Sequence, residues 1–436
     1  MPIIAVALAI IIILGLKLYS LSKVKPNIIL ITFDSLRADH LGCYGYTKDT
    51  SPFLDSLSKE ALIFTNCIAQ SGSTVPAISA LFTSRFPYLD SVVVEGDLQG
   101  ELGGRYLTIA EFLKDLEYDT LAIPGHYYVK KKFGFSRGFN YYNDNYNNRI
   151  NAQETLMRVI NLFKDKIIKK SFFLWIHFRE PHTPYSPPRE YVLQFSEPLN
   201  PTWHKDGVYV LSGENQKLTG RDINKFISGY DGNIRYADDK LREIFGYLNK
   251  KGILRKSIII ITADHAESLG AHGIFDHGFL YYGILRVPLI IKIPGYRGDK
   301  ITYPVSSVDI FPTIIGLLKG NKYLSRLNLR GKSLPGERNM DEAQFSEVPG
   351  SYSVIKNGWR VSLNLLNGEK KLFNVVLGPE EEKDLISEYP DIFQSLFYEL
   401  EKIRASASNL PRPSTDVKST LSKEDVEQLR ALGYAN

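Results

Sequence analysis

Four short apolar runs constrain the fold of this chain more than any other feature of its sequence. They are the segments 27–33 (NIILITF), 171–178 (SFFLWIHF), 257–262 (SIIIIT) and 287–293 (VPLIIKI). Each run is rich in β-branched or aromatic residues and is nearly continuous in its apolar character, which is typical of strands buried on both faces. We therefore expect them to be strands of a mostly parallel sheet.

Helical patterns between these runs complete the prediction of the fold class. In the clearest pattern, apolar residues recur at alternating spacings of three and four from Ile227 through Ile234 and Leu241 to Leu248, which lines one face of a helix. A second pattern covers residues 156–167. Because strands alternate with helices, we expect an α/β fold: a three-layer α/β/α sandwich with a mostly parallel central sheet.

The pattern changes after about Leu334. Between residues 352 and 376, shorter strand-like pieces are separated by Asn357-Gly358 and Asn367-Gly368, and Asn-Gly dipeptides strongly favour hairpin turns. This part of the chain is therefore expected to form a small antiparallel β subdomain. A polar linker with two prolines follows at residues 405–420, and a capped terminal helix is expected after it.

The amino-terminal residues differ in composition from the rest of the chain. Residues 2–16 (PIIAVALAIIIILGL) carry no side-chain charge, and with Lys17, which can snorkel, the stretch approaches the roughly 20 residues that a spanning helix needs. A cleaved secretory signal would usually begin with a basic region, which this segment lacks. We expect an uncleaved single-pass membrane anchor. The expected divisions of the chain are the transmembrane anchor over 1–22, the α/β domain over 26–335, the small antiparallel β subdomain over 336–390, and a helix, linker and terminal helix over 391–436.

Composition excludes several classes of protein. The 436 residues are 44% apolar and 23% charged, and 53 basic residues against 48 acidic ones leave a net charge of +5. These values exclude wholesale disorder and a polytopic membrane protein. No run of Lys and Arg resembles a nucleic-acid-binding arm, so we expect no nucleic-acid partner. Cys43 and Cys67 are too few for a disulfide scaffold or a Cys-built zinc module, and both are expected to be small core residues.

Polar clusters follow three of the apolar runs. Asp34 directly follows the first run, His182 lies shortly after the second, and Asp264-His265 follows the third, with His277 a dozen residues later. Ligands of open α/β sheets bind beyond the carboxyl ends of the strands, so these residues are expected to meet. Asp34 alone would suit a helix cap or a turn. Two carboxylates with one imidazole suit a divalent cation, so Asp34, Asp264 and His265 together are expected to bind a metal ion.

A candidate nucleophile lies in the segment 72–76 (GSTVP), which leads into a helical stretch at 77–82. Pro76 suits a first helical turn, which places Thr74 at the helix N-terminus. A threonine there commonly serves as a cap, but the same position has free backbone N–H groups and positive dipole character. A Thr74 hydroxyl touching a metal ion would be acidified and able to attack a phosphorus or sulfur centre. Beside the expected metal site, the nucleophile is the favoured interpretation.

Taken in order, these segments resemble the sulfatase family within the alkaline phosphatase superfamily. NIILITFDSLRADHLGCYGY resembles the family's opening strand and loop, and SPFLDSLSKEALIFTNCIAQSGSTVPAISALFTSRFP resembles its nucleophile region. EPHTPYSPP is similar to the central His-Pro segment, IIIITADHAESLGAHGIFDHGFLYYGILRVPLIIKIPG to the second metal segment, and LFNVVLGPEEEKDL to the closing strand. The resemblance covers residues 27–385 and implies an alkaline phosphatase-like fold.

The resemblance also implies roles for individual residues. The ligands of one divalent ion (Mn, Zn, Ca or Mg) would be Asp34, Thr74, Asp264 and His265. The catalytic residues would be Thr74 as nucleophile, with His182 and His277 facing the transferred group and the leaving oxygen. Enzymes of this type are often extracytoplasmic, which favours that side for the catalytic domain. The lysines after the anchor favour a cytoplasmic domain under the positive-inside rule, so the orientation is left open.

Several residues depart from the sulfatase pattern. Sulfatases carry a Cys or Ser in a C/S-x-P-x-R signature that is oxidised to formylglycine, whereas this chain has Thr74 there and Ile78 in place of the arginine. Oxidation of a threonine would give a ketone instead of the aldehyde, so no formylglycine is expected. Ser35 replaces an acidic residue, His265 an asparagine and His277 a lysine. A threonine beside an Asp-His metal pair is similar instead to the superfamily's phosphodiesterases and phosphoglycerol transferases.

These observations lead to one leading hypothesis and two alternatives. The leading hypothesis is a membrane-anchored, metal-dependent hydrolase or transferase that acts on phosphate or sulfate esters through a covalent threonine intermediate, with phosphate esters favoured. Its substrate would be an anionic ester, either lipid-linked or part of a glycan. The first alternative is a true sulfuric ester hydrolase that works without formylglycine. The second is a non-catalytic, membrane-tethered protein that binds anionic glycans or lipid headgroups.

Overall fold

The structure is a computed structural model. The residues that it describes are 25–94, 99–147, 149–165, 168, 170–195, 220–325, 327, 329–336 and 340–406. The anchor predicted over 1–22 lies outside them, as do the linker and the terminal helix predicted beyond residue 406. Within the described ranges, no helix is both long enough and apolar enough to cross a membrane.

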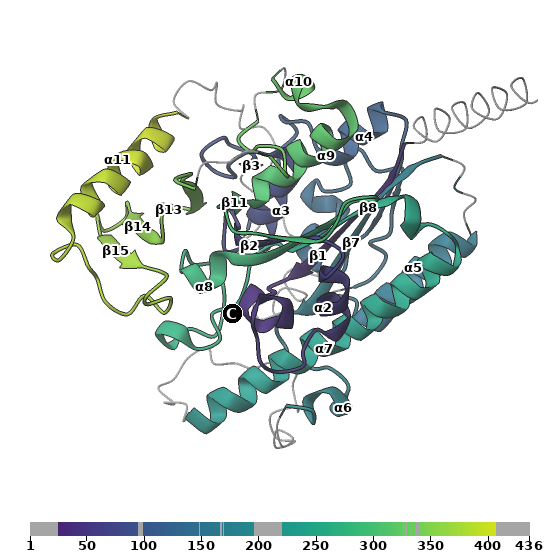
Figure 1. The fold of residues 1–436 in the computed structure, drawn as a ribbon, viewed down its shortest axis with the longest axis horizontal. Coiled ribbons are helices and arrows are strands. Elements are labelled where there is room, and N and C mark those ends of the chain that lie inside the picture. Colours follow the sequence, from purple (N-terminus) through teal and green to yellow (C-terminus); the bar gives the residue numbers. More distant parts are fainter. Residues whose placement is uncertain are drawn as a thin grey trace, which may run out of the picture.

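A mostly parallel sheet runs through the middle of the molecule (Figure 1). Its strand order is β10-β2-β9-β8-β1-β7-β5-β6, with β11 paired to β2. β1 pairs in parallel with both β7 and β8, and β5 pairs in parallel with β7 and β6. The strands are β1 (Asn27–Asp34), β2 (Leu62–Ile68), β5 (Asp119–Ile123), β6 (Tyr141–Tyr142), β7 (Phe172–Pro181), β8 (Ser257–Ala263), β9 (Arg286–Lys292), β10 (Asp299–Ile301) and β11 (Val305–Ser306).

One of the four predicted strands runs opposite to the expected direction. β9, which contains most of the apolar run at 287–293, pairs antiparallel with both β8 and β2. A parallel neighbour requires a crossover that returns the chain to the starting edge of the sheet. Only loops, a 3-10 turn at Ala271–Gly273 and the four-residue helix α8 (Tyr282–Leu285) separate β8 from β9, so the chain re-enters the sheet from the edge at which it left.

Helices cover both faces of the sheet and confirm the predicted three-layer α/β/α class (Figure 1). α3, α4 and α9 lie on one face, and α2, α5 and α7 lie on the other. The helical patterns at 227–248 and 156–167 correspond to α7 and α5, respectively. The helices are α2 (Pro52–Ser58), α3 (Thr74–Thr83), α4 (Ile109–Asp115), α5 (Ala152–Asp165), α6 (Arg189–Val192), α7 (Gly220–Lys250), α9 (Ile310–Lys319), α10 (Asn321–Leu324) and α11 (Pro390–Ala405).

Two aspartates of α7 attach the segment after β1 to this helix. The apolar spacing of this helix predicts that Asp231 and Asp238 lie on its polar edge, but both are buried. Asp231 accepts hydrogen bonds from the Tyr46 hydroxyl (2.9 Å) and the Lys48 ammonium (2.8 Å). Asp238 accepts two backbone N–H groups in the first turn of α2, at 2.8 and 2.9 Å. Buried carboxylates are stable when hydrogen bonds satisfy them in this way.

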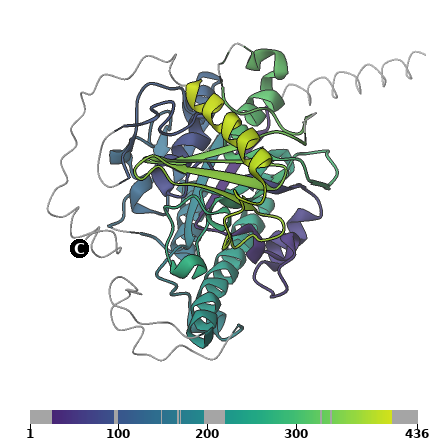
Figure 2. The ribbon, with the colours of Figure 1, turned by 90° about the vertical axis from the view of Figure 1, so that its left-hand side faces the viewer.

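The C-terminal part forms the predicted antiparallel sheet, in the order β12-β13-β14-β15. Asn357 and Gly358 form a two-residue turn between β13 and β14, with φ of 51° and 76°. A type I′ turn needs positive φ at both positions, which is the reason that Asn-Gly predicts it. α11 packs across β13 and β14 (Figure 2). These strands are β12 (Gln344–Val348), β13 (Ser351–Lys356), β14 (Trp359–Asn364) and β15 (Lys370–Asn374).

The two sheets are joined by an apolar contact and by a buried carboxylate. Ile68 and Leu285 of the main domain pack with Ile355 and Val375 of the C-terminal sheet. Glu347 on β12 is fully buried, and its Oε1 accepts two backbone N–H groups of the segment after α3, at 2.8 and 2.9 Å. Burial raises the pKa of Glu347 to about 8, so the folded chain favours the protonated acid.

We expect Glu347→Gln to stabilise the protein at high pH. The unfolded glutamate ionises near pH 4.3 and the folded one near pH 8, so this group costs stability increasingly as the pH rises between those values. Glutamine keeps a carbonyl oxygen for the two N–H groups and carries no ionisable acid. Denaturant unfolding measures the free energy of unfolding of both proteins. The wild type and the variant should have similar values at pH 5, and at pH 9 the variant should be more stable by on the order of 1 kcal/mol or more.

The control is Glu382→Gln, at an exposed position of the same subdomain. This variant should match the wild type at both pH values. A Glu347→Gln variant whose stability relative to the wild type does not change with pH would contradict the account of Glu347.

Candidate active site

The site lies over the carboxyl ends of the adjacent strands β5, β7, β1 and β8. The register of the sheet pairs Phe33 with Ala263, so Asp34 and Asp264 leave neighbouring strands at the same level. Asp34 also stands opposite Pro181 at the end of β7. The first residues beyond these strands therefore meet at one edge of the sheet, as expected for an open α/β fold.

Asp34 and Asp264 are buried carboxylates that are only partly hydrogen-bonded. Asp264 Oδ1 accepts the backbone N–H groups of Ser35 (3.2 Å) and His265 (2.7 Å), and Asp34 Oδ1 accepts the Ser35 hydroxyl (3.3 Å). Asp34 Oδ2 and Asp264 Oδ2 are buried and make no hydrogen bond to any residue that the structure describes. Buried carboxylate oxygens without donors are suited to bind a cation.

Both carboxylates have pKa values far above the usual range for aspartate. Burial raises the pKa of Asp34 to about 7. Burial and, secondly, the charge of Asp34 raise the pKa of Asp264 to about 8. Two carboxylates this close cannot both be ionised cheaply without a counter-charge. A divalent cation between them would supply it.

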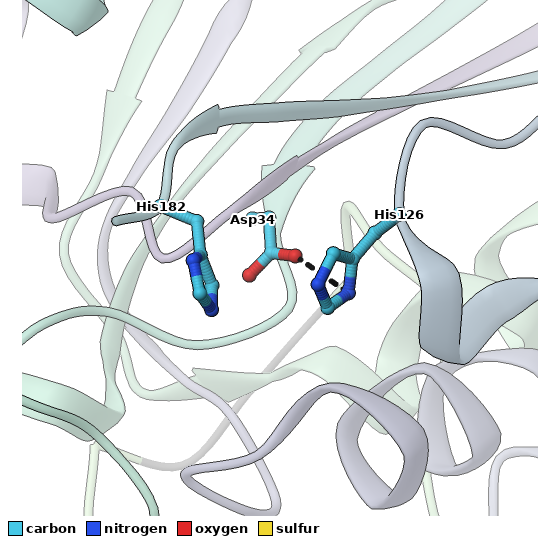
Figure 3. A group of neighbouring side chains, drawn as sticks. All are labelled: Asp34, His126 and His182. Atoms are coloured by element: carbon cyan, nitrogen blue, oxygen red, sulfur yellow. Dashed lines mark ion pairs between the residues drawn. The ribbon is translucent and has the colours of Figure 1, made fainter. Parts of the chain in front are cut away.

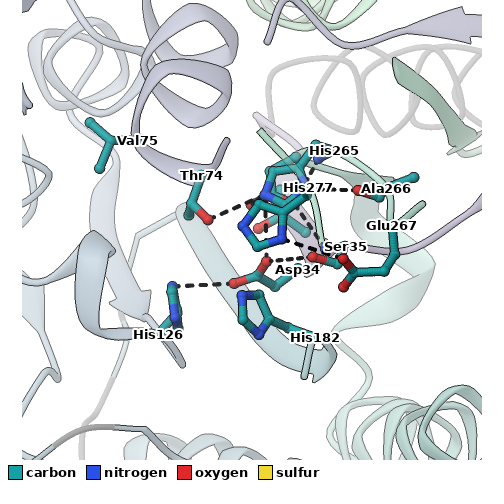
Figure 4. Close-up of polar contacts among 12 residues, drawn as sticks. Asp34, Ser35, Thr74, Val75, His126, His182, His265, Ala266, Glu267 and His277 are labelled. Atoms are coloured by element: carbon teal, nitrogen blue, oxygen red, sulfur yellow. Dashed lines mark hydrogen bonds and ion pairs between the residues drawn. The ribbon is translucent and has the colours of Figure 1, made fainter. Parts of the chain in front are cut away.

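Thr74 is the first residue of α3, and its side chain points into the site (Figure 4). Ser73 occupies the cap position, so Thr74 is not the helix cap. The Thr74 Oγ1 lies 3.3 Å from His265 Nε2, and Thr74 is fully buried. The preceding Gly72 allows this loop to lie against the next one, because a Cβ there would lie 2.4 Å from the Phe279 carbonyl oxygen.

His265 lies between the hydroxyl and the two carboxylates. Its Nδ1 is 3.1 Å from the Ala266 carbonyl oxygen, which requires the proton on Nδ1 and leaves the Nε2 lone pair for the site. This Nε2 is 3.7 Å from Asp34 Oδ1 and 3.6 Å from Asp264 Oδ2. Donor atoms around a tetrahedral ion with bonds of about 2.1 Å lie about 3.4 Å apart. The residues therefore fit a divalent cation held by Asp34, Thr74, Asp264 and His265.

His126 and His177 face the other oxygen of Asp34, Oδ2. The Asp34 carboxylate lies between His126 and His182 (Figure 3). Its Oδ2 is 3.2 Å from His126 Nδ1 and 3.6 Å from His177 Nε2. His177 Nδ1 pairs with the Thr32 hydroxyl at 2.7 Å, so a buried hydrogen bond fixes this ring. Burial lowers the pKa of His177 to about 4, which keeps the imidazole neutral at neutral pH.

The His277 ring is held in its cationic form by two neighbouring carboxylates. Burial alone would lower the pKa of His277, but the hydrogen bonds and charges of Asp276 and Glu267 hold it well above its usual range. Its Nδ1 is 3.1 Å from Asp276 Oδ1 and 3.5 Å from Glu267 Oε1. The ring stacks on that of His265, with centroids 4.5 Å apart (Figure 4). An imidazolium in this position can bind an anionic group or donate a proton.

The model of the sulfatase family matches residues 26–320. The chain belongs to the sulfatase family. It is 26% identical over 329 residues to the ulvan-active sulfatase of Formosa agariphila, an alignment that spans 67% of this chain and 61% of that protein. The match also bears out the resemblance drawn from the sequence motifs.

Two solved structures have the same fold as this chain. The protein BT4656, solved in complex with its substrate D-glucosamine-2-N,6-O-disulfate, has a TM-score of 0.71 at 19% identity and covers 88% of this chain and 98% of its own. The phosphonate monoester hydrolase of Agrobacterium radiobacter has the same TM-score and identity and covers 88% of this chain and 96% of its own. These neighbours confirm the alkaline phosphatase-like fold.

In this sulfatase-family chain, the structure brings the predicted site residues together and adds a histidine that lies in none of the predicted motifs. The predicted residues that meet are Asp34, Thr74, His182, Asp264, His265 and His277. The addition is His126, which follows β5. The signal was the short apolar stretch at 121–123, followed by Pro124 and Gly125. His272, a spare histidine in the sequence, is exposed, and its ring stacks on Tyr281 with centroids 3.9 Å apart.

We expect divalent metal binding to strengthen as the pH rises from 6 to 8. Metal ligands must lose their protons, and Asp34 and Asp264 hold theirs up to about pH 7 and pH 8 in the metal-free chain. Binding of Mn²⁺ should therefore release protons and be weaker by roughly tenfold or more at pH 6 than at pH 8. Isothermal titration calorimetry in buffers of different ionisation enthalpy measures both quantities.

The matched control for this titration is Asp276→Asn, which changes an acidic residue that contacts His277 and none of the proposed ligands. It should leave the pH dependence of Mn²⁺ binding in place, whereas Asp264→Asn should abolish high-affinity binding. Equal Mn²⁺ affinity at pH 6 and pH 8 would contradict the assignment of the two buried carboxylates as ligands.

Proposed function

We propose that this chain is a metal-dependent hydrolase or transferase that acts on phosphate or sulfate esters through a covalent intermediate on Thr74, with phosphate esters favoured. Membership of the sulfatase family supports an ester hydrolase. The observation that carries the proposal is the position of the Thr74 hydroxyl. It is buried at the N-terminus of α3, 3.3 Å from His265 Nε2 and beside two carboxylates that each have one buried oxygen without a hydrogen bond to the described residues.

The proposed reaction has two steps. In the first, the Thr74 hydroxyl gives up its proton and its oxygen attacks the phosphorus or sulfur atom. The ester bond breaks, the leaving oxygen takes up a proton and departs as the alcohol, and a phospho- or sulfothreonine forms. In the second, water or an acceptor hydroxyl attacks the same atom, the bond to Thr74 breaks, and the threonine regains its proton. A divalent ion held by Asp34, Thr74, Asp264 and His265 would supply Lewis-acid chemistry that lowers the pKa of the hydroxyl and offsets negative charge.

Side chains on the other side of the site would bind the transferred group. His277 is the proton donor best placed for the leaving oxygen, because Asp276 and Glu267 keep the ring protonated. His182 lies next to it, with ring centroids 5.0 Å apart. The N-terminus of α3 adds positive dipole character where negative charge develops. The site would therefore hold an anionic tetrahedral group with its leaving oxygen toward His277 and with the attacking Thr74 oxygen on the opposite face.

Two observations favour phosphate over sulfate esters. Thr74 cannot form the formylglycine aldehyde of sulfatases, and Ile78, fully buried in α3, replaces the signature arginine. The structural likeness to a phosphonate monoester hydrolase supports phosphorus chemistry on this fold. A true sulfuric ester hydrolase without formylglycine is the second candidate, because the ulvan-active relative is named as a sulfatase.

A solved neighbour and the amino-terminal segment support the proposed substrate class and location. The neighbour BT4656 binds a sulfated sugar, which supports a glycan ester as one substrate class for this chain. The predicted anchor over 1–22 favours a membrane location, where a lipid-linked ester is the other class. We propose a single-pass membrane protein with an anionic ester substrate, and the orientation of its catalytic domain stays open.

Thr74→Val should abolish turnover while the protein stays folded. Valine has nearly the volume of threonine but lacks the hydroxyl, so the attacking atom is lost and the rate should fall by roughly a thousandfold or more. Thr74→Ser keeps a hydroxyl and should retain measurable activity. The measurement is steady-state hydrolysis of an aryl phosphodiester and an aryl sulfate by the metal-loaded full chain.

A trapping experiment and a control complete this test. Acid quenching during turnover should leave one phosphoryl or sulfuryl group on the Thr74 peptide, detected by mass spectrometry. Thr83→Val, at the other end of the same helix, removes a hydroxyl that donates to the Ser79 carbonyl oxygen and should leave turnover intact. Undiminished hydrolysis by Thr74→Val would rule out the nucleophile. Tight binding of anionic glycans by a wild type that hydrolyses no ester would favour the non-catalytic alternative.

A further inference from the structure

A glutamate of the C-terminal subdomain is buried against the segment that follows His277. Glu380 and Glu382 are exposed, but Glu381 between them is buried. Its backbone has a φ of 55°, a left-handed conformation that is unfavourable for a residue with a side chain and persists only where the surroundings hold it. The surroundings of Glu381 therefore determine where its carboxylate lies.

The two carboxylate oxygens of Glu381 bind groups from two different parts of the chain. Oε1 accepts a guanidinium N–H of Arg360 on β14, which is also buried and donates to the Ser353 hydroxyl at 3.2 Å. Oε2 accepts the backbone N–H of Tyr282 at 2.7 Å. Tyr282 is the first residue of α8, so its N–H has no partner within that helix. The C-terminal sheet therefore holds the N-terminus of α8 through Glu381.

α8 lies where the main domain meets the C-terminal sheet (Figure 1), and it is hydrogen-bonded to the segment that precedes His277. The Ile284 carbonyl oxygen accepts the N–H of Ala266 at 2.7 Å. The next residue along the chain is Glu267, whose Oε1 lies 3.5 Å from His277 Nδ1. α8 therefore fixes the backbone beside a carboxylate that holds the His277 ring.

α8 is also close in sequence to His277 itself. Three residues separate it from Gly278, whose N–H donates to the Gly72 carbonyl oxygen at 2.7 Å. Because Gly72 lies two residues before Thr74, this bond ties the loop of His277 to the loop of the proposed nucleophile. The segment from His277 to α8 is thus held at one end by the Thr74 loop and at the other by Glu381.

We propose that Glu381 is a positioning residue for His277, and that the C-terminal subdomain completes the active site through this contact. The role rests on the proposed function, in which His277 faces the leaving oxygen and Thr74 attacks from the opposite side. Without an acceptor for the Tyr282 N–H, α8 loses its fixed N-terminus, and the His277 ring is no longer held in line with the attacking oxygen. A displacement on the order of 1 Å, caused by a change far from the reacting atoms, can lower a rate by about a hundredfold.

The test compares two double variants that both lack the buried ion pair. Arg360→Met with Glu381→Leu removes the acceptor, and Arg360→Met with Glu381→Gln keeps a carbonyl oxygen for Tyr282. Uncharged residues of similar volume can replace a buried ion pair without loss of the fold. The substrate is whichever aryl phosphodiester, phosphonate ester or sulfate the metal-loaded full chain cleaves fastest. Its kcat/KM should fall by about tenfold or more in the first variant and by less than about threefold in the second.

A double-mutant cycle with His277→Gln distinguishes positioning from a general structural role. If Glu381 acts through His277, the variant without the acceptor should lower kcat/KM by less than about threefold when residue 277 is already glutamine. A loss in that background as large as in the wild-type background would overturn the proposal. Equal values of kcat/KM for the two double variants would also overturn it.

Circular dichroism verifies that each variant is folded. If the variant without the acceptor is not, Glu381→Asp takes its place in the cycle, because aspartate keeps the charge near Arg360 and is too short to reach Tyr282. Failure of this role is distinct from failure of the proposed function. A wild type that hydrolyses none of these esters overturns the proposed function, whereas additive losses in an active enzyme overturn only the role of Glu381.

Discussion

The constraint on which the site depends is the burial of two carboxylates, Asp34 and Asp264, at the ends of adjacent strands. The sheet places them side by side, and backbone N–H groups satisfy only part of their hydrogen-bonding capacity. Burying two ionised carboxylates side by side costs free energy unless a cation neutralises them. The surrounding hydroxyl and imidazoles are the donors that a cation would use, so the site is best understood as an ion-binding centre that positions Thr74.

The fold was predictable where burial on both faces leaves a continuous apolar run, as in β1, β7 and β8. The direction of β9 was not, because it depends on whether the preceding connection crosses the sheet, and composition carries no such information. The burial of Asp231 and Asp238 was not predictable for a related reason. Helical periodicity identifies the face of α7 that packs on the sheet, but not the loops that cover the opposite face.

The site was predictable where a residue directly follows a strong strand signal, as Asp34 and Asp264 do. His126 was not singled out because β5 is short and begins with Asp119 and Thr120, so its signal is weak. Its position next to β7 follows from strand order, which one sequence does not specify. Gly125 allows the close approach, because a Cβ there would lie 2.4 Å from the His177 carbonyl oxygen. The role of Thr74 depends on helix α3 pointing its N-terminus at the ends of the strands.

The central claim is that this sulfatase-family chain uses a bound divalent ion and a threonine to cleave phosphate esters in preference to sulfate esters. The most direct measurement is kcat/KM of the full chain for an aryl phosphodiester, phosphate monoester, phosphonate ester and aryl sulfate in parallel, before and after chelation. We predict that kcat/KM for at least one phosphorus ester exceeds kcat/KM for the aryl sulfate by about tenfold or more, and that chelation removes all activity. Faster hydrolysis of the aryl sulfate than of every phosphorus ester, or hydrolysis rates that chelation leaves unchanged, would contradict the account.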